Sequence, residues 1–551
     1  MITVSNQTVS ISTQTLDAAI TNGYLTSLRD KHGVSFLGEV DNSAGSMLSL
    51  VYRGGERIQV NESKISSITC TSINDHMAQI VCEGWYGEGV LLIEEDEATG
   101  DLLLTPSVST KRDGLLACSM QIKGVRDDLK VVAPLYQGVC LDLGDPLINN
   151  QHFRWPIEWE AGLCIFQGQG NGFWVRCQDT KYTYKAIRFA GNGIYLNTEA
   201  HGPIDDNRAA GGLTWRVNVY NGGWEVPAKK YNSWLFDAYN FHGAMSRRPA
   251  WINDLKLAVS WCPTSIDLLD ALAAKSEPEK ILLHLPNWRN FGYDENYPDY
   301  MPSPKGQAFI DHAKNLGFHV LPHANSIDMD PTSDVYKRIA GFEYRDVENR
   351  KYLGWGYDKD VGVMDVPQAG GNFMDNRHRK VMIKVHPGLA MWRAILTSKI
   401  KESLEVTKVD GIFLDVTLCS FNVHNSLVEN TSTSEGMKLL LAQIASINGN
   451  TAIGGEGLNE ITVGDLSFAQ MHLFRSHQVS CAGLERTGAC NLNTYLYGGL
   501  CKLFGYSALG GKTEDSQMRM RITEEHDAIP TITVGGAHDI LDACEAVKAR
   551  L

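Results

Sequence analysis

The sequence predicts a multidomain protein of the β plus α/β class, with an N-terminal β-sandwich at residues 1–245 and a (β/α)8 TIM-type barrel at residues 246–551. Three observations support this prediction. A chain of 551 residues is too long for one ordinary hydrophobic core. Its first part consists of short alternating runs separated by turn residues, as in antiparallel sheets. After about Arg247, apolar runs alternate with amphipathic segments, which indicates parallel strands joined by helices.

The first 242 residues show closely spaced strand and turn signals. The run Gly89–Glu94 is followed by a turn at Ala98–Asp101, and Gly172–Cys177 is a second run of the same kind. This spacing predicts a large antiparallel sandwich. No convincing helical periodicity is visible in this part of the chain.

The second part alternates predicted strands with predicted helices. The predicted strands are Ile281–Leu285, Phe318–Pro322, Gly411–Asp415 and Thr451–Glu456. The predicted helices are Gln307–Asn315, which ends at Gly317, Trp392–Leu404 and Met437–Ile444. About 300 residues match a (β/α)8 barrel with insertions. We interpret the polar, glycine-rich segment Asp328–His378 as an excursion over the active-site face, and we place no strand after about Leu473.

Composition excludes several classes of partner. Fifty basic and 64 acidic residues give a net charge of −14, which is unfavourable for binding nucleic acid or an anionic membrane surface. No run approaches the roughly 18 apolar residues of a membrane span. The polar start Met1–Gln7 does not resemble a signal peptide, so we expect a cytoplasmic protein. The sequence does not predict an oligomeric state.

Motifs for metal and cofactor chemistry are missing from the sequence. Twelve cysteines occur without CxxC pairs, so neither a zinc site nor a disulfide framework is indicated. No His-x-His ends a predicted strand, and there is no Gly-x-Ser-x-Gly elbow, P-loop or dinucleotide fingerprint. We therefore expect no cofactor and no metal.

Two carboxylates end neighbouring predicted strands of the barrel. Asp415 follows Gly411–Leu414 and Glu456 follows Ala452–Gly455, 41 residues further on (456 − 415). Functional groups of such barrels lie at these strand ends. Glycosidic cleavage needs two carboxyl groups, one to attack or to activate water and one to protonate the leaving oxygen. Alternatively, each acid caps the next helix or pairs with an arginine, or Glu460 or Asp465 replaces Glu456 as the proton donor.

Polar and aromatic residues near the same strand ends are candidates for substrate binding. Aromatic faces stack on sugar rings, while Asp, Asn and His bond to their hydroxyls. The candidates are Trp288, Asp294, His323, Asn325, Trp355 and His424. The alternative interpretations are a core position for Trp288, a structural histidine at position 323, and a role for Trp355 in fixing its loop.

Several short motifs resemble those of a known group of proteins. They are Leu283-His284, Asn287-Trp288, Tyr297-Pro298-Asp299-Tyr300, Gly317-Phe318-His319-Val320, Trp392-Arg393 and Val409–Asp415. The array resembles uncharacterised bacterial glycoside-hydrolase-like proteins with a galactose-mutarotase-like β-sandwich and a TIM barrel. These are distantly similar to endo-α-N-acetylgalactosaminidases and the α-amylase-type barrel.

The resemblance implies a carbohydrate substrate and a retaining α-glycosidase that acts on a neutral or amino-sugar glycan. In the resembled enzymes an Asp ending the fourth strand is the nucleophile and a Glu ending the fifth is the acid/base, and Asp415 and Glu456 match these positions. We expect Asp415 to be ionised and Glu456 to be protonated, with the carboxyl groups about 5–5.5 Å apart. The alternatives are a non-catalytic carbohydrate-binding protein on a barrel scaffold, or a sugar lyase or isomerase with His323 as base.

Overall fold

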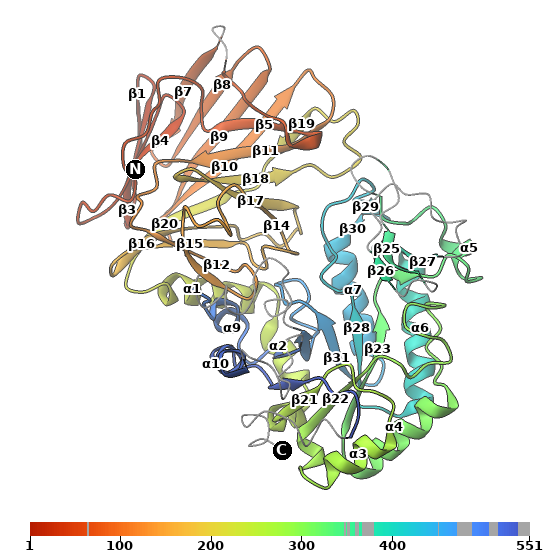
Figure 1. Cartoon of the computed structure of the whole chain (residues 1–551). Helices are drawn as coiled ribbons and strands as arrows, with labels where there is room; N and C mark the ends of the chain where they lie inside the picture. The colour runs from red at the N-terminus through yellow and green to blue at the C-terminus, as the bar shows by residue number, and fades with distance from the viewer. Residues whose placement is uncertain are drawn as a thin grey trace. The chain divides into compact units, whose positions relative to one another are not determined.

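The computed structural model describes the chain except for residues 63–65, 346–348, 350–352, 359–362, 366–378, 450, 471–487, 506–515 and 538–551. It divides into two compact units (Figure 1). Unit 1 comprises residues 1–238 and 487–496, and unit 2 comprises residues 239–486 and 497–551. The predicted boundary at 245/246 falls seven residues after the observed start of unit 2 (246 − 239). It does not anticipate that a second segment of the chain belongs to unit 1.

Unit 1 is built from antiparallel sheets. The first sheet contains β1 (Ile2–Ser5), β2 (Thr8–Ser12), β3 (Leu16–Thr21) and β4 (Tyr24–Asp30). The second has the order β13 (Val139–Asp142), β12 (Lys130–Ala133), β15 (Leu163–Gln167), β16 (Asn171–Arg176), β20 (Trp215–Asn221), β10 (Asp101–Thr110), β9 (Gly87–Asp96), β8 (Met77–Glu83) and β7 (Ser67–Asn74), with β19 (Ala209–Gly211) also on β10. The third has the order β14 (His152–Arg154), β17 (Lys185–Ala190), β18 (Gly193–Glu199), β11 (Leu115–Ile122), β5 (Leu48–Tyr52) and β6 (Arg57–Gln59). The β-rich N-terminal part predicted from the alternating runs is confirmed.

Two features of unit 1 differ from the prediction. The helix α1 (Glu225–Ala238) lies where no helical periodicity was recognised. Its buried residues Ala228, Tyr231 and Leu235 do follow a helical spacing, but Pro227 and a lysine pair beside them obscure it. The returning segment 488–496 pairs with the strand β13 region, since Cys140 N donates to Gly488 O (2.8 Å) and Cys490 N to Gly138 O (3.0 Å).

Unit 2 contains a nearly closed parallel barrel. Its eight-stranded sheet has the order β33 (Lys502–Phe504), β32 (Phe468–Gln470), β31 (Ala452–Glu456), β28 (Gly411–Asp415), β23 (His319–Asn325), β22 (Ile281–Leu285), β21 (Leu257–Val259) and β34 (Thr531–Ile532). Every ladder in this sheet is parallel. An isolated parallel bridge connects Leu503 of β33 with Ala528, which precedes β34 by three residues (531 − 528). In sequence order β28 and β31 are therefore the fourth and fifth barrel strands.

Helices and a small sheet connect the barrel strands (Figure 1). The helices are α2 (Phe241–Arg247), α3 (Ile266–Ala273), α4 (Pro304–Leu316), α5 (Tyr336–Ile339), α6 (Ala390–Thr407), α7 (Thr433–Ala445), α9 (Leu492–Tyr497, at the unit boundary) and α10 (Ser516–Glu525). The 3-10 helices η2 (Ala250–Asp254) and η3 (Pro278–Lys280) also belong to unit 2, whereas η1 (Arg53–Gly55) belongs to unit 1. The excursion after β23 forms a sheet ordered β24 (Asp328–Met329), β27 (Arg379–Lys384), β25 (Leu353–Asp358) and β26 (Val363–Asp365). A hairpin, β29 (Leu427–Val428) with β30 (Thr431–Ser432), precedes α7. The predicted helices correspond to α4, α6 and α7, and α4 ends at Gly317 (φ 102°) as expected.

The barrel interior is filled by side chains. One apolar layer comprises Ala258, Leu282, Leu321, Phe413, Ala452, Phe468, Phe504 and Ile529. Because side chains alternate along a strand, the next inward position lies two residues further on. Most of these next positions carry buried polar residues, namely Ser260, His284, His323, Asp415, Gln470 and Thr531, whereas the position after Ala452 is Gly454. The carboxyl-end face of the barrel is therefore underlain by a buried polar layer.

Candidate active site

Asp415 and Glu456 end adjacent parallel strands. Residues Gly411–Leu414 of β28 pair in register with Ala452–Gly455 of β31, which brings the two carboxyl-bearing residues opposite each other. A Cβ on Gly454 would lie 2.7 Å from the Phe413 ring, and one on Gly455 would lie 2.8 Å from Leu466. These glycines are needed for the close packing of the strands that hold the pair. Asp415 is 7% and Glu456 9% exposed, so both groups are largely withdrawn from water.

The backbone around Asp415 is held by several hydrogen bonds. Its carbonyl accepts from Ser326 N (3.0 Å) and from Ser326 Oγ (2.7 Å). Its side chain accepts a bond from the Tyr293 hydroxyl, with 3.3 Å between Oη and Oδ2. His323 Nε2 lies 3.7 Å from the same Oδ2 atom. The carboxyl therefore has one aromatic hydroxyl and one imidazole in reach.

Glu456 is hydrogen-bonded to the two residues that follow Asp415 at the end of β28. Its Oε2 accepts a hydrogen bond from Val416 N at 3.1 Å. Its backbone N donates to Thr417 Oγ1 (2.9 Å), and Thr417 Oγ1 donates back to its carbonyl (2.9 Å). These three bonds connect the fourth and fifth strands beyond their ladder, so they set the mutual position of the two acids.

Residues at three strand ends on this side of the barrel have a left-handed backbone. Trp261 has a φ of 54°, Asp294 a φ of 54° and Val416 a φ of 66°. For a β-branched residue such as Val416 this conformation is a genuine outlier. Strain of this kind costs about 1–3 kcal/mol per residue and clusters at functional sites. The three strained residues flank Asp415 from three different strand ends.

Electrostatics favour a protonated carboxyl at Asp415. Burial raises the pKa of Asp415 well above its usual range, and the neighbouring Glu456, Asp294 and Asp328 carboxylates raise it further, while Lys384 lowers it. The direction of this shift opposes the expectation of an ionised Asp415, which stays a prediction. The physical reason is that its opposite acid and its burial outweigh the single hydroxyl that donates to it.

Trp288, His323 and Asn325, which the sequence suggested for substrate binding, are buried supports in the structure. Trp288 is 0% exposed, and its indole Nε1 donates to His323 O at 2.9 Å. Asn325 Oδ1 accepts from Ile327 N (3.1 Å) and Asp328 N (2.7 Å), which shapes the turn after β23. Trp288 thus occupies the core position that was the alternative interpretation, and it has no free ring face for a sugar.

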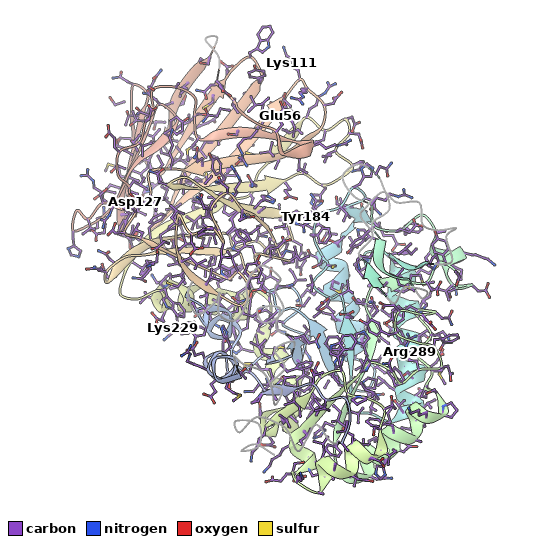
Figure 2. All side chains as sticks on the ribbon, viewed as in Figure 1. Glu56, Lys111, Asp127, Tyr184, Lys229 and Arg289 are labelled. Carbon is purple, nitrogen blue, oxygen red and sulfur yellow. The ribbon has the colours of Figure 1, made fainter. Side chains whose placement is uncertain are left out.

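Asp294 lies in the loop after β22, together with Tyr293. Burial raises the pKa of Asp294 to about 7, and the Asp328 carboxylate adds to the rise. Arg289, labelled in Figure 2, organises this loop by donating to the carbonyls of Glu295 (3.1 Å), Asp299 (2.7 Å) and Gly292 (2.8 Å). The loop therefore presents both Tyr293 and Asp294 near Asp415.

The other sequence candidates have varied positions. The side chain of Trp355, in β25, lies outside the described residues. His424 donates its backbone N–H to Arg345 O at 2.7 Å and is not connected to the acid pair by a described contact. Glu460 is buried (2% exposed) four residues after Glu456. Asp465 lines a cavity of about 390 Å³ with Thr451 and Ser467, which precede β31 and β32, so it lies at the opposite end of the barrel strands.

Several residues of the site were not recognised in the sequence. Trp261 follows β21 and is 37% exposed, and its ring lies 5.2 Å from that of Tyr293. Asp328 and Lys384 form a buried ion pair of 2.8 Å in the small sheet. β21 is only three residues long, so no periodicity identified Trp261 as a strand-end residue. Lys384 lies six residues after the end of the predicted excursion (384 − 378) and carries no motif.

Comparison with known proteins relates this architecture to glycoside hydrolases. Residues 213–426 match the family model described as a domain of unknown function, DUF6259. No curated protein matches the chain in sequence. The ligand-free α-N-acetylgalactosaminidase NagBb from Bifidobacterium bifidum is similar in structure, with a TM-score of 0.64 and 13% identity over 100% of this chain and 93% of that chain. Its GalNAc complex gives 0.61 and 11%, over 91% and 84% of the two chains.

A second kind of glycosidase shares the fold more distantly. The GH36 α-galactosidase AgaB from Geobacillus stearothermophilus matches with a TM-score of 0.50 and 9% identity, over 100% of this chain and 84% of that chain. The structural neighbours are thus glycoside hydrolases, and the likeness is one of fold. No helix in the described residues is long and apolar enough to cross a membrane. The same residues contain no cluster of metal-ligating side chains.

Proposed function

We propose that this protein is a retaining α-glycosidase in which Asp415 is the nucleophile and Glu456 the acid/base. The observation that carries the proposal is the pair of buried carboxyl groups on adjacent strand ends, with Glu456 bound to the backbone of the residue after Asp415. Glycosidic cleavage requires two carboxyl groups held on either side of the scissile bond. The fold shared with glycoside hydrolases supports the same reaction class.

The two carboxyl groups are placed to share one proton. Burial and mutual repulsion disfavour two negative charges, so near neutral pH the pair holds one proton. With substrate bound, this proton is on Glu456, which protonates the leaving oxygen while ionised Asp415 attacks the anomeric carbon. Tyr293 Oη, which already donates to Asp415, favours the ionised form.

His323 is a poor candidate for the base of a lyase or isomerase. Its pKa is lowered well below its usual range by burial, then by the neighbouring His284 and Arg289. A weakly basic, buried imidazole abstracts a proton from a sugar carbon less readily than an exposed one. This observation favours the carboxyl-pair reaction over the alternative in which His323 acts alone.

The proposed substrate is an α-linked, neutral or amino-sugar glycan of galactose configuration. Support comes from the structural neighbours, whose names specify α-N-acetylgalactosaminidase and α-galactosidase. Trp261 and Tyr293 offer partly exposed rings beside Asp415, as ring stacking on a sugar requires. Trp355 and His424 remain proposed as further substrate contacts.

The test is a screen with 4-nitrophenyl α- and β-glycosides of galactose, N-acetylgalactosamine, glucose and N-acetylglucosamine. We expect turnover of an α-galactoside or an α-N-acetylgalactosaminide. Proton NMR of the first product then reports the stereochemistry, and the α anomer should form first. A β anomer as first product would overturn the retaining mechanism. Saturable binding without turnover of any glycoside would favour a non-catalytic carbohydrate-binding protein.

A further inference from the structure

Two buried histidines form a hydrogen-bonded pair beneath Asp415. His284 lies in β22 and His323 in the adjacent strand β23, two residues beyond the residue that pairs with His284, and His284 Nε2 lies 3.2 Å from His323 Nδ1. Both rings pack on Phe413, with centroid distances of 4.6 Å for His284 and 5.3 Å for His323. One nitrogen of this contact must donate and the other must accept. The direction of this bond decides whether His323 Nε2, the nitrogen that faces Asp415, carries a proton.

A long contact from the backbone of Trp261 indicates the direction of this bond. Its N–H donates to His284 Nδ1 at 3.5 Å, and the Ser260 hydroxyl lies 3.5 Å from the same nitrogen. A backbone N–H can only donate, so Nδ1 of His284 must present its lone pair. Burial lowers the pKa of His284 to about 3, so the ring is neutral and its one proton is on Nε2.

The proton on His284 in turn determines which nitrogen of His323 is protonated. The Nε2–H of His284 donates to Nδ1 of His323, which must then be unprotonated. His323 is also neutral, because burial, then His284, lowers its pKa well below the usual range. Its single proton therefore lies on Nε2, which is 3.7 Å from Asp415 Oδ2 and has no hydrogen-bond partner among the described residues.

We propose that His323 is a positioning residue that aims an uncharged Nε2–H donor at Asp415, in a tautomer fixed through His284 by the backbone N–H of Trp261. The relay runs from Trp261 N to His284, to His323 and to Asp415. It stabilises the ionised carboxylate without adding a positive charge that would repel a developing oxocarbenium ion. This inference rests on the proposed function, because Asp415 is the group on which the relay acts.

The structure explains why the relay stays in place. The Trp288 indole holds the carbonyl of His323 at 2.9 Å. Trp261 has its strained φ of 54° at the position where its amide meets His284. The ionisable groups with a described contact or electrostatic interaction with Asp415 are Glu456, Asp294, Asp328, Lys384, Tyr293, Tyr297 and His323. Of these, Tyr293, Tyr297 and His323 carry a donor without charge, and the relay orients only His323.

The first test reads the tautomers without any turnover. Long-range 1H–15N correlation spectra of protein labelled with 15N-histidine identify the protonated nitrogen of each ring. Spectra of His284→Gln and His323→Gln assign the two signals. We expect both rings to be neutral with the proton on Nε2 between pH 5.5 and 8. A proton on Nδ1 of either ring, or an imidazolium in this range, would overturn the relay whether or not the protein cleaves glycosides.

The second test compares two variants at the first ring. In His284→Gln the side-chain oxygen can accept from Trp261 N and the amide can donate to His323, so the polarity of the relay is kept. His284→Leu fills the space but removes both bonds. We expect His284→Gln to keep kcat/KM within about threefold, and His284→Leu to lose about 10- to 100-fold, mostly in kcat. The acid limb of the pH profile should move to higher pH only in His284→Leu. Equal behaviour of the two variants would overturn the role assigned to the relay, and the tautomer spectra would separate this outcome from failure of the proposed glycosidase function.

Discussion

The amide nitrogen of Val416 donates a hydrogen bond to Oε2 of Glu456, with 3.1 Å between the two atoms. Val416 directly follows Asp415 and holds a left-handed φ of 66°. The hydrogen-bond donor that positions the Glu456 carboxylate is therefore a backbone amide next to Asp415, which is more rigid than a side-chain donor. Reacting groups that must stay within a fraction of an ångström of each other benefit from rigid support of this kind. The predictions below follow from this arrangement and from the charges around it.

Asp415→Asn should remove nearly all glycosidase activity. An amide of the same size keeps the contacts to Ser326 and the Tyr293 region but cannot form a glycosyl ester. We expect kcat to fall by more than about 10⁴-fold, as when the nucleophile of another hydrolase is removed. The measurement is turnover of the best aryl α-glycoside from the screen.

A matched control for this variant exists on the same strand. Asp410 precedes Gly411 at the other end of β28, where it pairs with His319 at 3.1 Å on the surface. Asp410→Asn should keep kcat within about twofold and change the free energy of unfolding by less than about 1 kcal/mol. Full activity in Asp415→Asn would refute the assignment of the nucleophile.

The rate at which Glu456 variants cleave a glycoside should depend on its leaving group. Without an acid, the first step still proceeds for a 4-nitrophenyl leaving group, whereas a natural alcohol needs the proton. We expect Glu456→Gln to lose about 10²–10⁴-fold on an unactivated glycoside and much less in the first step of an aryl glycoside. A burst of nitrophenol should reveal accumulation of the glycosyl-enzyme.

Azide provides the complementary experiment. In Glu456→Ala the space left by the side chain admits a small anion that can attack the glycosyl-enzyme from the vacated side. We expect azide to restore turnover and to yield a glycosyl azide of retained configuration. If Glu460→Gln shows the dependence on the leaving group while Glu456→Gln does not, Glu460 is the proton donor instead.

The two acids that the sequence predicted end strands of five residues, which are longer than β21 and β34. The residues before Asp415 and Glu456 form apolar runs of four and are followed or preceded by recognisable helices, so the strand ends could be located. Trp261 could not be found, because β21 and β34 have only three and two residues and their neighbours carry no periodic pattern. Lys384 joins Asp328 through sheet pairing of β27 with β24, which depends on contacts distant in sequence.

Asp294 should make the free energy of unfolding fall as pH rises from about 4 to 7. Burial, then Asp328, raises its pKa in the folded protein to about 7, compared with 3.8 for the free side chain. Between these values the folded state retains the proton and the unfolded state has lost it, so higher pH favours unfolding. The effect amounts to roughly 4 kcal/mol across this interval and is constant above it.

Asp294→Asn should abolish this contribution to the pH dependence. Urea unfolding of the wild type and the variant at several pH values isolates it, because other titrating groups cancel in the difference. Asp299→Asn, in the same loop, is the control and should leave the slope unchanged. A wild-type and an Asp294→Asn profile that run parallel from pH 4.5 to 7 would contradict the raised pKa of Asp294.

Removing only one partner of the ion pair between Asp328 and Lys384 should lower the free energy of unfolding strongly. Both groups are buried, at 1% and 6% exposure, with 2.8 Å between Oδ1 and Nζ. Lys384→Met leaves an uncompensated carboxylate in the interior, which should lower the free energy of unfolding by about 3–5 kcal/mol. The exposed pair of Lys399 with Glu402 supplies the control, because Lys399→Met should cost less than about 1 kcal/mol.

The same substitution should change catalysis in a predictable direction. Lys384 lowers the pKa of Asp415, whereas the Asp328 carboxylate raises it. Lys384→Met removes the first influence and keeps the second, so the acid limb of kcat/KM should move to higher pH. In the double variant Asp328→Asn/Lys384→Met both influences are gone, so stability and the acid limb should return towards the wild type. If the double variant is less stable than Lys384→Met, or its acid limb lies at still higher pH, the pair does not act on Asp415 through its charge.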